Sequence, residues 1–141
     1  MAHPLTPVPT PETQPYWDGV AAETVRLPRC RQCSNAFFPP TPICPNCSAQ
    51  DLEWFDASGS ATLYSYVIHH RPLAEWGTEG PRSVAIVELD EGPRIISSVV
   101  GCDQTPEALV IDMPLQAVFV PFDNITVLAF EPAAANEAVA S

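Results

Sequence analysis

Four cysteines in two C-x-x-C pairs constrain this chain more than any other feature. Cys30 and Cys33 form the first pair and Cys44 and Cys47 the second, with ten residues between the pairs. Each short turn brings two sulfurs to one point, and four thiolates complete the tetrahedral shell of a structural zinc site, with Zn–S bonds of about 2.3 Å. A closed shell leaves no position for a substrate or an activated water. The spacing therefore predicts a structural Zn²⁺ that holds the N-terminal third of the chain together.

Two disulfide bonds are the competing interpretation of the same cysteines. Disulfides persist in oxidising compartments. Residues 1–15 contain no apolar segment that could serve as a signal peptide, and no stretch approaches the roughly 20 apolar residues of a membrane span. We therefore expect a cytoplasmic protein without membrane contact, and a metal site in place of disulfides.

The charge balance restricts the class of partner. Seventeen acidic residues stand against six basic ones, which are all arginine, and the formal net charge is -11. Nucleic-acid binding depends mainly on cationic side chains that neutralise phosphates. We therefore expect no nucleic-acid partner.

Prolines and composition divide the chain into four parts. Residues 1–14 are rich in proline, which predicts an extended lead, and residues 133–141 are rich in alanine, which predicts a tail that frays. Between them we expect a helix and zinc ribbon over residues 15–56 and a strand-rich domain over residues 57–132.

A short helix is predicted over residues 15–23. Thr13 is a candidate N-cap, and Tyr16, Trp17 and Val20 recur at helical spacing on one face. This face either packs against the rest of the protein or forms a docking surface for a partner.

The remainder of the chain is predicted to form strands. Runs of β-branched and aromatic residues bounded by Gly, Pro and Asp turns predict them at residues 52–56, 61–71, 83–89, 94–100, 115–121 and 126–131. Residues 104–111 are expected to form a short helix or loop. Five strands after the ribbon, with such a segment between the third and the fourth, are the order of an OB-fold barrel.

The chain resembles the DUF35 family over residues 15–131. The resemblance is carried by the four cysteines and by Tyr16-Trp17, Phe38-Pro39-Pro40, Cys44-Pro45-x-Cys47, Leu52-Glu53-Trp54, Ser58-Gly59, Tyr64-Ser65-Tyr66, His70-Arg71-Pro72, the run from Val87 to Arg94, Gly101-Cys102-Asp103 and Met113-Pro114. It implies a mostly β protein, with a short N-terminal helix and a rubredoxin-like zinc ribbon followed by a five-stranded OB-fold barrel.

The sequence departs from the family pattern at three turns. Both cysteine knuckles usually continue into glycine, which readily adopts a positive φ, whereas this chain has Ser34 and Ser48. Glycine also commonly precedes the Met-Pro pair, where this chain has Asp112.

The resemblance implies a partner subunit. Members of the family accompany thiolase-like proteins that act on acyl-CoA, including thiolases, hydroxymethylglutaryl-CoA synthase assemblies and retro-aldol lyases that shorten steroid side chains. The expected function is therefore a non-catalytic subunit of a hetero-oligomer, which binds and supports a thiolase or a steroid side-chain aldolase. Acyl-CoA is a ligand that the two subunits could share.

Three arginines are candidates for contact with CoA. Arg71, Arg82 and Arg94 could meet its phosphates, because guanidinium groups match phosphate geometry. Internal salt bridges are the alternative use of each. Trp76 is a candidate interface anchor together with Tyr16 and Trp17, because tryptophan is enriched among binding hot spots.

No residue pattern predicts a catalytic group with comparable specificity. His69 and His70 are neighbours in an expected strand, so they point to opposite faces and only one could enter a given site. Cys102 follows an expected buried strand and is not tied to a histidine by any motif, which is typical of a packed small residue. A stand-alone acyl-CoA hydrolase or transferase and a nucleic-acid-binding ribbon and OB module remain as alternatives.

Overall fold

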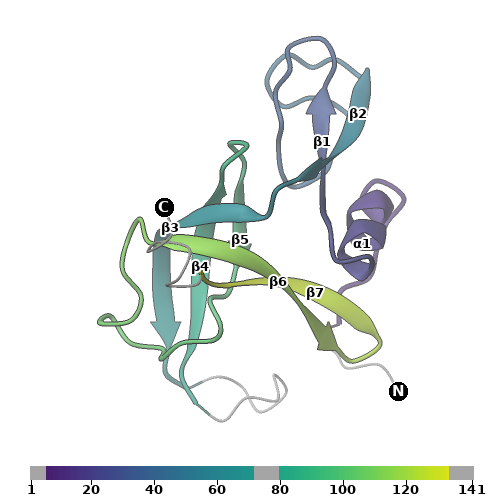
Figure 1. The fold of residues 1–141 in the computed structure, drawn as a ribbon. Helices are drawn as coiled ribbons and strands as arrows, with labels where there is room; N and C mark the ends of the chain where they lie inside the picture. Colours follow the sequence, from purple (N-terminus) through teal and green to yellow (C-terminus); the bar gives the residue numbers. More distant parts are fainter. Residues whose placement is uncertain (1–5, 72–79, 134–141) are drawn as a thin grey trace.

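A computed structural model describes residues 6–71 and 80–133 of the chain. Within these residues one helix accompanies a two-stranded sheet and a five-stranded sheet (Figure 1). The elements are α1 (Gln14–Ala21), β1 (Val25–Cys30), β2 (Leu52–Ala57), β3 (Ser60–His69), β4 (Arg82–Leu89), β5 (Arg94–Ser97), β6 (Pro114–Phe122) and β7 (Ile125–Pro132). The predicted fold class is confirmed. One detail differs from expectation, because β1 was not predicted as a strand. Residues 104–111 form bends and turns, which is the loop alternative of the prediction.

Helix α1 packs through the face that the sequence predicted. Tyr16 and Val20 are buried, and the helix lies against β1 and β7. Thr13 takes the N-cap position, but its side chain does not cap the helix and instead accepts a hydrogen bond from the backbone N–H of Thr10 at 2.9 Å. At eight residues this helix is short, and no helix in the described ranges has the length and hydropathy needed to cross a membrane.

The C-terminal end of α1 places a glutamate in a left-handed conformation. Glu23 has a φ of 60°, its N–H donates to the Val20 carbonyl, and the next N–H, of Thr24, donates to the Gly19 carbonyl. These two bonds form a Schellman motif, which usually has glycine at the position of Glu23. The exposed glutamate therefore carries backbone strain that glycine would not have.

Replacing Glu23 with glycine is expected to raise the free energy of unfolding by about 1 kcal/mol, because it removes this strain. Thermal and denaturant unfolding of the zinc-loaded protein would measure the change. Ala22→Gly is the matched control: Ala22 has a φ of -93°, so glycine there is expected to cost about 0.5–1 kcal/mol. A Glu23→Gly protein that is less stable than the parent would contradict this account of the helix end.

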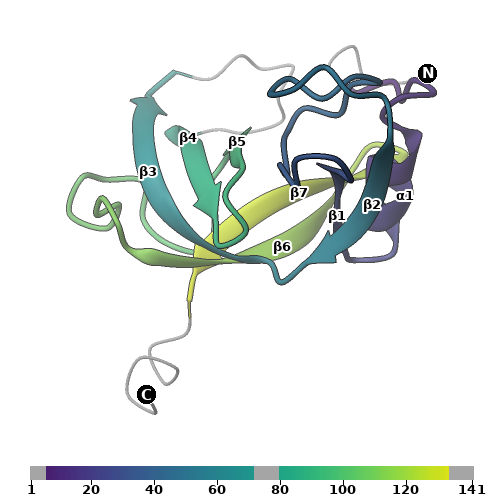
Figure 2. The ribbon, with the colours of Figure 1, turned by 90° about the horizontal axis from the view of Figure 1, so that it is seen from above.

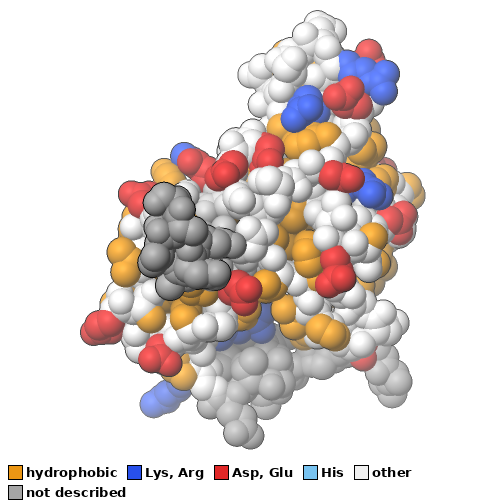
Figure 3. Space-filling view, in the orientation of Figure 1, with side chains coloured by type: hydrophobic (Ala, Val, Ile, Leu, Met, Phe, Trp, Pro, Cys, Tyr) orange, Lys and Arg blue, Asp and Glu red, His pale blue; other side chains and the backbone are white. Residues whose placement is uncertain are grey.

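Strands β1 and β2 form the antiparallel body of the ribbon. Their register sets Arg26 opposite Asp56 and Arg29 opposite Glu53, and these pairs form salt bridges of 3.0 Å and 4.0 Å. The Arg29 guanidinium also lies over the ring of Phe55, 3.9 Å from its centroid. In Figure 3 the blue side chains of the ribbon accordingly lie beside red ones at the top of the molecule.

The five-stranded sheet curls into the OB-type half-barrel in the order β5-β4-β3-β6-β7 (Figure 2). Strand β3 pairs with β4 along most of its length and with β6 through only three residues. The two edges of the sheet meet in a parallel bridge between Val99, two residues beyond the end of β5, and Phe130 of β7. There the Phe130 N–H donates to the Ser98 carbonyl at 3.0 Å, and the Val100 N–H donates to the Phe130 carbonyl at 2.7 Å. These bonds form the seam of the barrel.

The core fills the inside of this curl and continues under α1. Alternate residues along the strands point inward, which matches the period of two in a strand. Its most buried side chains include Phe130, Leu63, Val87, Leu89, Leu115, Val20 and Leu27, each no more than 2% exposed. One shared core therefore joins the helix, the base of the ribbon and the barrel.

A two-residue junction connects the ribbon to the barrel. Ser58 and Gly59 lie between β2 and β3, and Gly59 has a φ of 84°. A Cβ at Gly59 would lie 2.8 Å from the amide nitrogen of Gln116 and 3.3 Å from the Cβ of Ala117, so only glycine fits without a shift. The Glu91 carboxylate, from the turn between β4 and β5, accepts a hydrogen bond from the Ser58 N–H at 2.9 Å. The barrel thus contacts this two-residue junction directly.

Candidate functional site

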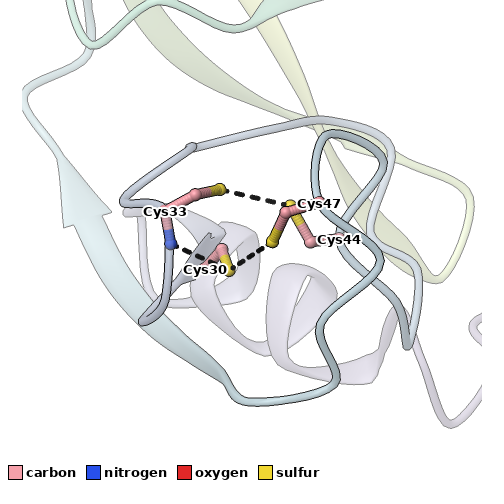
Figure 4. A group of neighbouring side chains, drawn as sticks. All are labelled: Cys30, Cys33, Cys44 and Cys47. Carbon is pink, nitrogen blue, oxygen red and sulfur yellow. Dashed lines mark hydrogen bonds between the residues drawn. The ribbon is translucent and has the colours of Figure 1, made fainter.

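The four predicted metal ligands converge at the tip of the ribbon. The sulfurs of Cys30, Cys33, Cys44 and Cys47 all lie within 4.8 Å of one another, and the side chains point toward a common centre (Figure 4). The Cys30 and Cys47 sulfurs are 3.6 Å apart, as are those of Cys33 and Cys44. Four sulfurs around zinc at bonds of about 2.3 Å would lie about 3.8 Å apart. The donor set and its dimensions therefore fit a closed tetrahedral zinc site.

The two knuckles have the same backbone hydrogen bonds. In the first, the Ser34 N–H donates to the Cys30 carbonyl; in the second, the Ser48 N–H donates to the Cys44 carbonyl, each at 2.9 Å. Ser34 and Ser48 have φ angles of 64° and 67°, and Asp112 has 70°. All three departures from the family pattern thus keep the positive φ that glycine usually supplies there.

Asparagine side chains and backbone N–H groups surround the sulfurs. The Asn46 amide nitrogen donates to the Cys33 sulfur at 3.5 Å, and the Asn46 backbone N–H donates to the Cys44 sulfur at 3.4 Å. The hydrogen bond from Asn46, with help from the backbone N–H of Asn35, lowers the pKa of Cys33 to about 6. These donors favour thiolate, which is the form that binds metal.

Asn46→Ala is expected to weaken zinc affinity by about tenfold or more, because groups that hydrogen-bond to ligands orient them and stabilise their charge. Competition with a chromophoric chelator at fixed pH would measure the affinity. Asn124→Ala, at an exposed position in the turn between β6 and β7, is the matched control and should leave the affinity unchanged. Equal affinities for the two variants would contradict the role assigned to Asn46.

The disulfide alternative receives no support from the described structure. None of the five cysteines is joined in a disulfide bond. The four knuckle sulfurs meet as a cluster, whereas two disulfides would require only that they meet in pairs.

An apolar cleft on the barrel is a second candidate site, which the sequence did not predict. It is a cleft of about 800 Å³, open to solvent on one side, beside the seam. Strands β4 and β5 contribute Arg82, Val84 and Ile96 to one wall, and the β6–β7 hairpin contributes Val120 and Val127 to the other. The cleft escaped prediction because its lining comes from segments that are distant in sequence and meet only when the barrel curls.

The structure separates the three candidate arginines. The Nε of Arg94 donates to Glu88 at 2.8 Å, and its guanidinium lies 3.8 Å from the centroid of the Tyr64 ring. The Glu88 carboxylate raises the pKa of Arg94. Arg94 therefore has the internal salt bridge that was the alternative to CoA binding. Arg82 lines the apolar cleft and Arg71 is exposed just beyond β3, so contact of either with CoA stays a prediction.

The aromatic candidates for partner contact differ in exposure. Tyr16 is 6% exposed, packs edge-on against Trp17 at 5.0 Å and contacts the ring of Phe38 at 5.2 Å. Burial raises the pKa of its hydroxyl to about 12. Tyr16 therefore packs inside the protein, which is one of the two predicted roles of this helix face. Trp17 is half-buried, and its partner contact stays a prediction; Trp76 lies outside the described residues.

The surroundings of Cys102 do not favour catalysis. Burial raises the pKa of Cys102, and the Asp103 carboxylate adds to this effect, so the environment disfavours a reactive thiolate. His69 is half-buried near the end of β3, and the adjacent His70 is exposed.

Comparisons with known proteins follow the same division into ribbon and barrel. Residues 17–53 match the family model described as ChsH2, rubredoxin-like zinc ribbon domain, and residues 54–120 match ChsH2, C-terminal OB-fold domain. The chain is also 40% identical over 92 residues to a DUF35 domain-containing scaffold protein of Methanothermobacter thermautotrophicus, covering 64% of this chain and 68% of that protein. The chain belongs to the ChsH2/DUF35 family.

Two further relatives of this ChsH2/DUF35 protein have more specific names. A solved structure named Ltp2-ChsH2(DUF35) aldolase superposes with a TM-score of 0.81 at 30% identity, covering 92% of this chain and 100% of that chain. The 3-oxo-4,17-pregnadiene-20-carboxyl-CoA hydratase alpha subunit of Mycobacterium tuberculosis is 32% identical over 128 residues. That match covers 91% of this chain but 40% of the relative, so this chain spans less than half the length of the hydratase subunit.

Proposed function

We propose that this ChsH2/DUF35 protein is a non-catalytic subunit that binds and supports a thiolase-like acyl-CoA enzyme. Its partner would be a thiolase or a retro-aldol lyase acting on steroid side-chain CoA thioesters, and together they would form a hetero-oligomer. The proposal includes a role in positioning the acyl-CoA.

The observation that carries the proposal is the end-to-end match with a subunit of an aldolase. The superposition covers all of that chain and leaves out 8% of this one, since 92% is covered. A match that includes both the ribbon and the barrel supports a shared mode of assembly with a partner subunit. A match to one module would support only a shared fold.

The chemistry of the described side chains favours the role of a non-catalytic subunit over that of a stand-alone enzyme. The four knuckle thiols are committed to one closed cluster. The raised pKa of Cys102 is the opposite of what a nucleophilic thiol needs. In the proposed complex the reacting groups would therefore come from the partner.

The nucleic-acid alternative is weakened by the use of the arginines. Arg26, Arg29, Arg31 and Arg94 each form salt bridges with acidic side chains of the same chain. Paired cations contribute little to phosphate neutralisation. Titration of labelled DNA and RNA at low salt gives the direct test, and tight, salt-sensitive binding would restore this alternative.

Co-expression with candidate thiolase-like proteins from the source genome tests the proposal. We expect the two to co-purify through size-exclusion chromatography as one species, and the partner to lose activity or solubility without this chain. Mass photometry would give the stoichiometry. A monomer that leaves the activity of such an enzyme unchanged, or that turns over acyl-CoA by itself, would contradict the proposal.

A further inference from the structure

We propose that the free edge of β2 binds an extended, basic segment of a partner protein, which adds to the ribbon as a further strand. Strand β2 is the outer strand of the two-stranded sheet, and β1 is its one neighbour among the described strands (Figure 1). That this partner is the thiolase-like subunit rests on the proposed function. Strand addition is a property of this chain and can be measured without that subunit.

A proline in β1 determines which backbone groups of β2 face outward. Along an antiparallel pair, hydrogen-bonded and non-hydrogen-bonded residue pairs alternate. Pro28 lies opposite Trp54, has no N–H, and its carbonyl accepts from the Phe37 N–H at 3.2 Å. These two residues therefore form a non-hydrogen-bonded pair. The N–H and C=O groups of Trp54 point away from β1, as do those of Leu52 and Asp56, which lie two positions away on either side.

The neighbouring hydrogen bonds follow the same alternation. The Cys30 N–H donates to the Asn35 carbonyl at 2.9 Å, away from β2, whereas the Arg31 N–H donates toward β2, to the Asp51 carbonyl at 3.0 Å. The opposite edge of the sheet is closed, because β1 forms a bridge with Ala36 there. The open edge of the ribbon is therefore the edge of β2.

The groups along this edge are accessible and lack partners. Within residues 6–71 and 80–133, the outward backbone groups of Leu52, Trp54 and Asp56 have no hydrogen-bond partner. Trp54 is 37% exposed, and Asp56 is also exposed. The strand contains no proline, lysine or bulge, which are devices that protect exposed edges, and its six pairs with β1 run in one unbroken register. Extended peptides add to sheets at edges of this kind.

Charge selects the occupant of the edge. Asp51, Glu53 and Asp56 lie on or beside β2, whereas the arginines that pair with them lie on or beside β1. An incoming strand would therefore lie next to the carboxylates, and opposite charges on neighbouring strands attract. A second copy of this chain would bring the same carboxylates and a formal net charge of -11, which disfavours pairing of β2 with itself.

Trp54 provides an apolar anchor on the same edge. Its indole and the Asp56 carboxylate lie on one face of the strand, because side chains alternate with a period of two. Tryptophan is enriched among the residues that dominate binding energy at interfaces. The complementary segment therefore carries apolar side chains opposite Leu52 and Trp54. Basic side chains on it lie opposite Glu53 and Asp56.

Titration of the full-length, zinc-loaded chain with the synthetic peptide Thr-Lys-Thr-Val-Arg-Val-Lys tests the inference. We expect saturable binding by nuclear magnetic resonance. At saturation, hydrogen exchange at the outward amides of Leu52, Trp54 and Asp56 should slow about tenfold or more. Exchange at Glu53 and Phe55, which already pair with β1 through hydrogen bonds, should change little. A control peptide with glutamate at each basic position should bind about tenfold more weakly or less.

Trp54→Pro and Trp54→Ala form a matched pair of variants. Both lack the indole, and only the proline variant also lacks the outward N–H. That N–H takes no part in the pairing with β1, so the ribbon should tolerate proline there, and both variants should keep their zinc. We expect Trp54→Pro to bind the peptide about three- to tenfold more weakly than Trp54→Ala. Equal affinities of the two variants, or no saturable binding by the parent, would overturn the inference.

Sedimentation velocity separates a foreign segment from a second copy of the chain. We expect the parent to sediment as a monomer in the absence of the peptide. If the parent self-associates and Trp54→Pro remains monomeric, the occupant of the edge is a second copy and the inference is wrong.

The same variants separate this inference from the proposed function. If the parent binds no peptide, and both Trp54 variants co-purify with a thiolase-like protein as the parent does, the inference is wrong while the proposed function stands. If the peptide binds as expected but no thiolase-like protein associates, the proposed function fails and the assignment of the β2 edge stands.

Discussion

Replacing Cys44 with serine is expected to leave less than about one tenth of a zinc ion per chain after purification without chelator. Cys44 is 1% exposed and its sulfur lies within 4.8 Å of the other three. A serine hydroxyl does not replace a thiolate in a structural zinc site. Because metal binding supplies much of the folding free energy of small zinc modules, the ribbon should also lose its folded structure. Metal analysis by mass spectrometry would measure the first effect.

Hydrogen exchange would locate the structural consequence. We expect the amides of β1 and β2 to lose protection in the Cys44→Ser protein, whereas those of β3 and β4, which lie in the barrel sheet, keep most of theirs. Cys102→Ser is the matched control and should retain about one zinc ion per chain. Stoichiometric zinc in the Cys44→Ser protein would show that the four-thiolate assignment is wrong.

Replacing Phe130 with alanine is expected to lower the free energy of unfolding by about 3–5 kcal/mol. Its ring is fully buried in the common core. Its backbone also forms the parallel bridge that joins the edges of the sheet. The cavity would therefore open at the point where the curl closes, and collapse of the neighbours into it is restricted by the seam. Chemical denaturation of the zinc-loaded protein would measure the loss.

Ile96→Ala provides the comparison for this loss. Ile96 is a large apolar residue of the same sheet but is 74% exposed, so its truncation should change stability by no more than about 0.5 kcal/mol. A Phe130→Ala protein that loses less than about 1 kcal/mol would mean that the seam relaxes freely, and the barrel would then be less tightly closed than described.

The local features of the site could be predicted from sequence because they depend on short spacings. Two C-x-x-C turns define four ligands, and the positive φ at Ser34 and Ser48 follows from the turn that such a knuckle makes. The order of the strands was also accessible, since runs of β-branched residues between turns determine it. Strand β1 escaped because Pro28 within it argues against a strand. The strand tolerates this proline, which has no N–H to donate, and its carbonyl accepts from the Phe37 N–H.

Features that depend on distant contacts could not be predicted in the same way. The sequence left two roles open for Arg94, contact with CoA or an internal salt bridge. The register of β4 and β5 places Glu88 opposite Arg94, and the two side chains form a salt bridge. The cleft needed the curl of the whole sheet, because its walls include residues as far apart as Val84 and Val127. Neither strand register nor sheet curvature can be read from a local sequence pattern.

The hydrogen bond from Ser58 to Glu91 has a consequence for assembly. It ties the two-residue junction between the ribbon and the barrel to a turn of the barrel, next to Gly59, whose positive φ disfavours other residues. Rotation of one module against the other is therefore restrained before any encounter. When a partner binds both modules at once, this chain therefore loses little conformational entropy. A larger share of the contact energy is then retained as affinity.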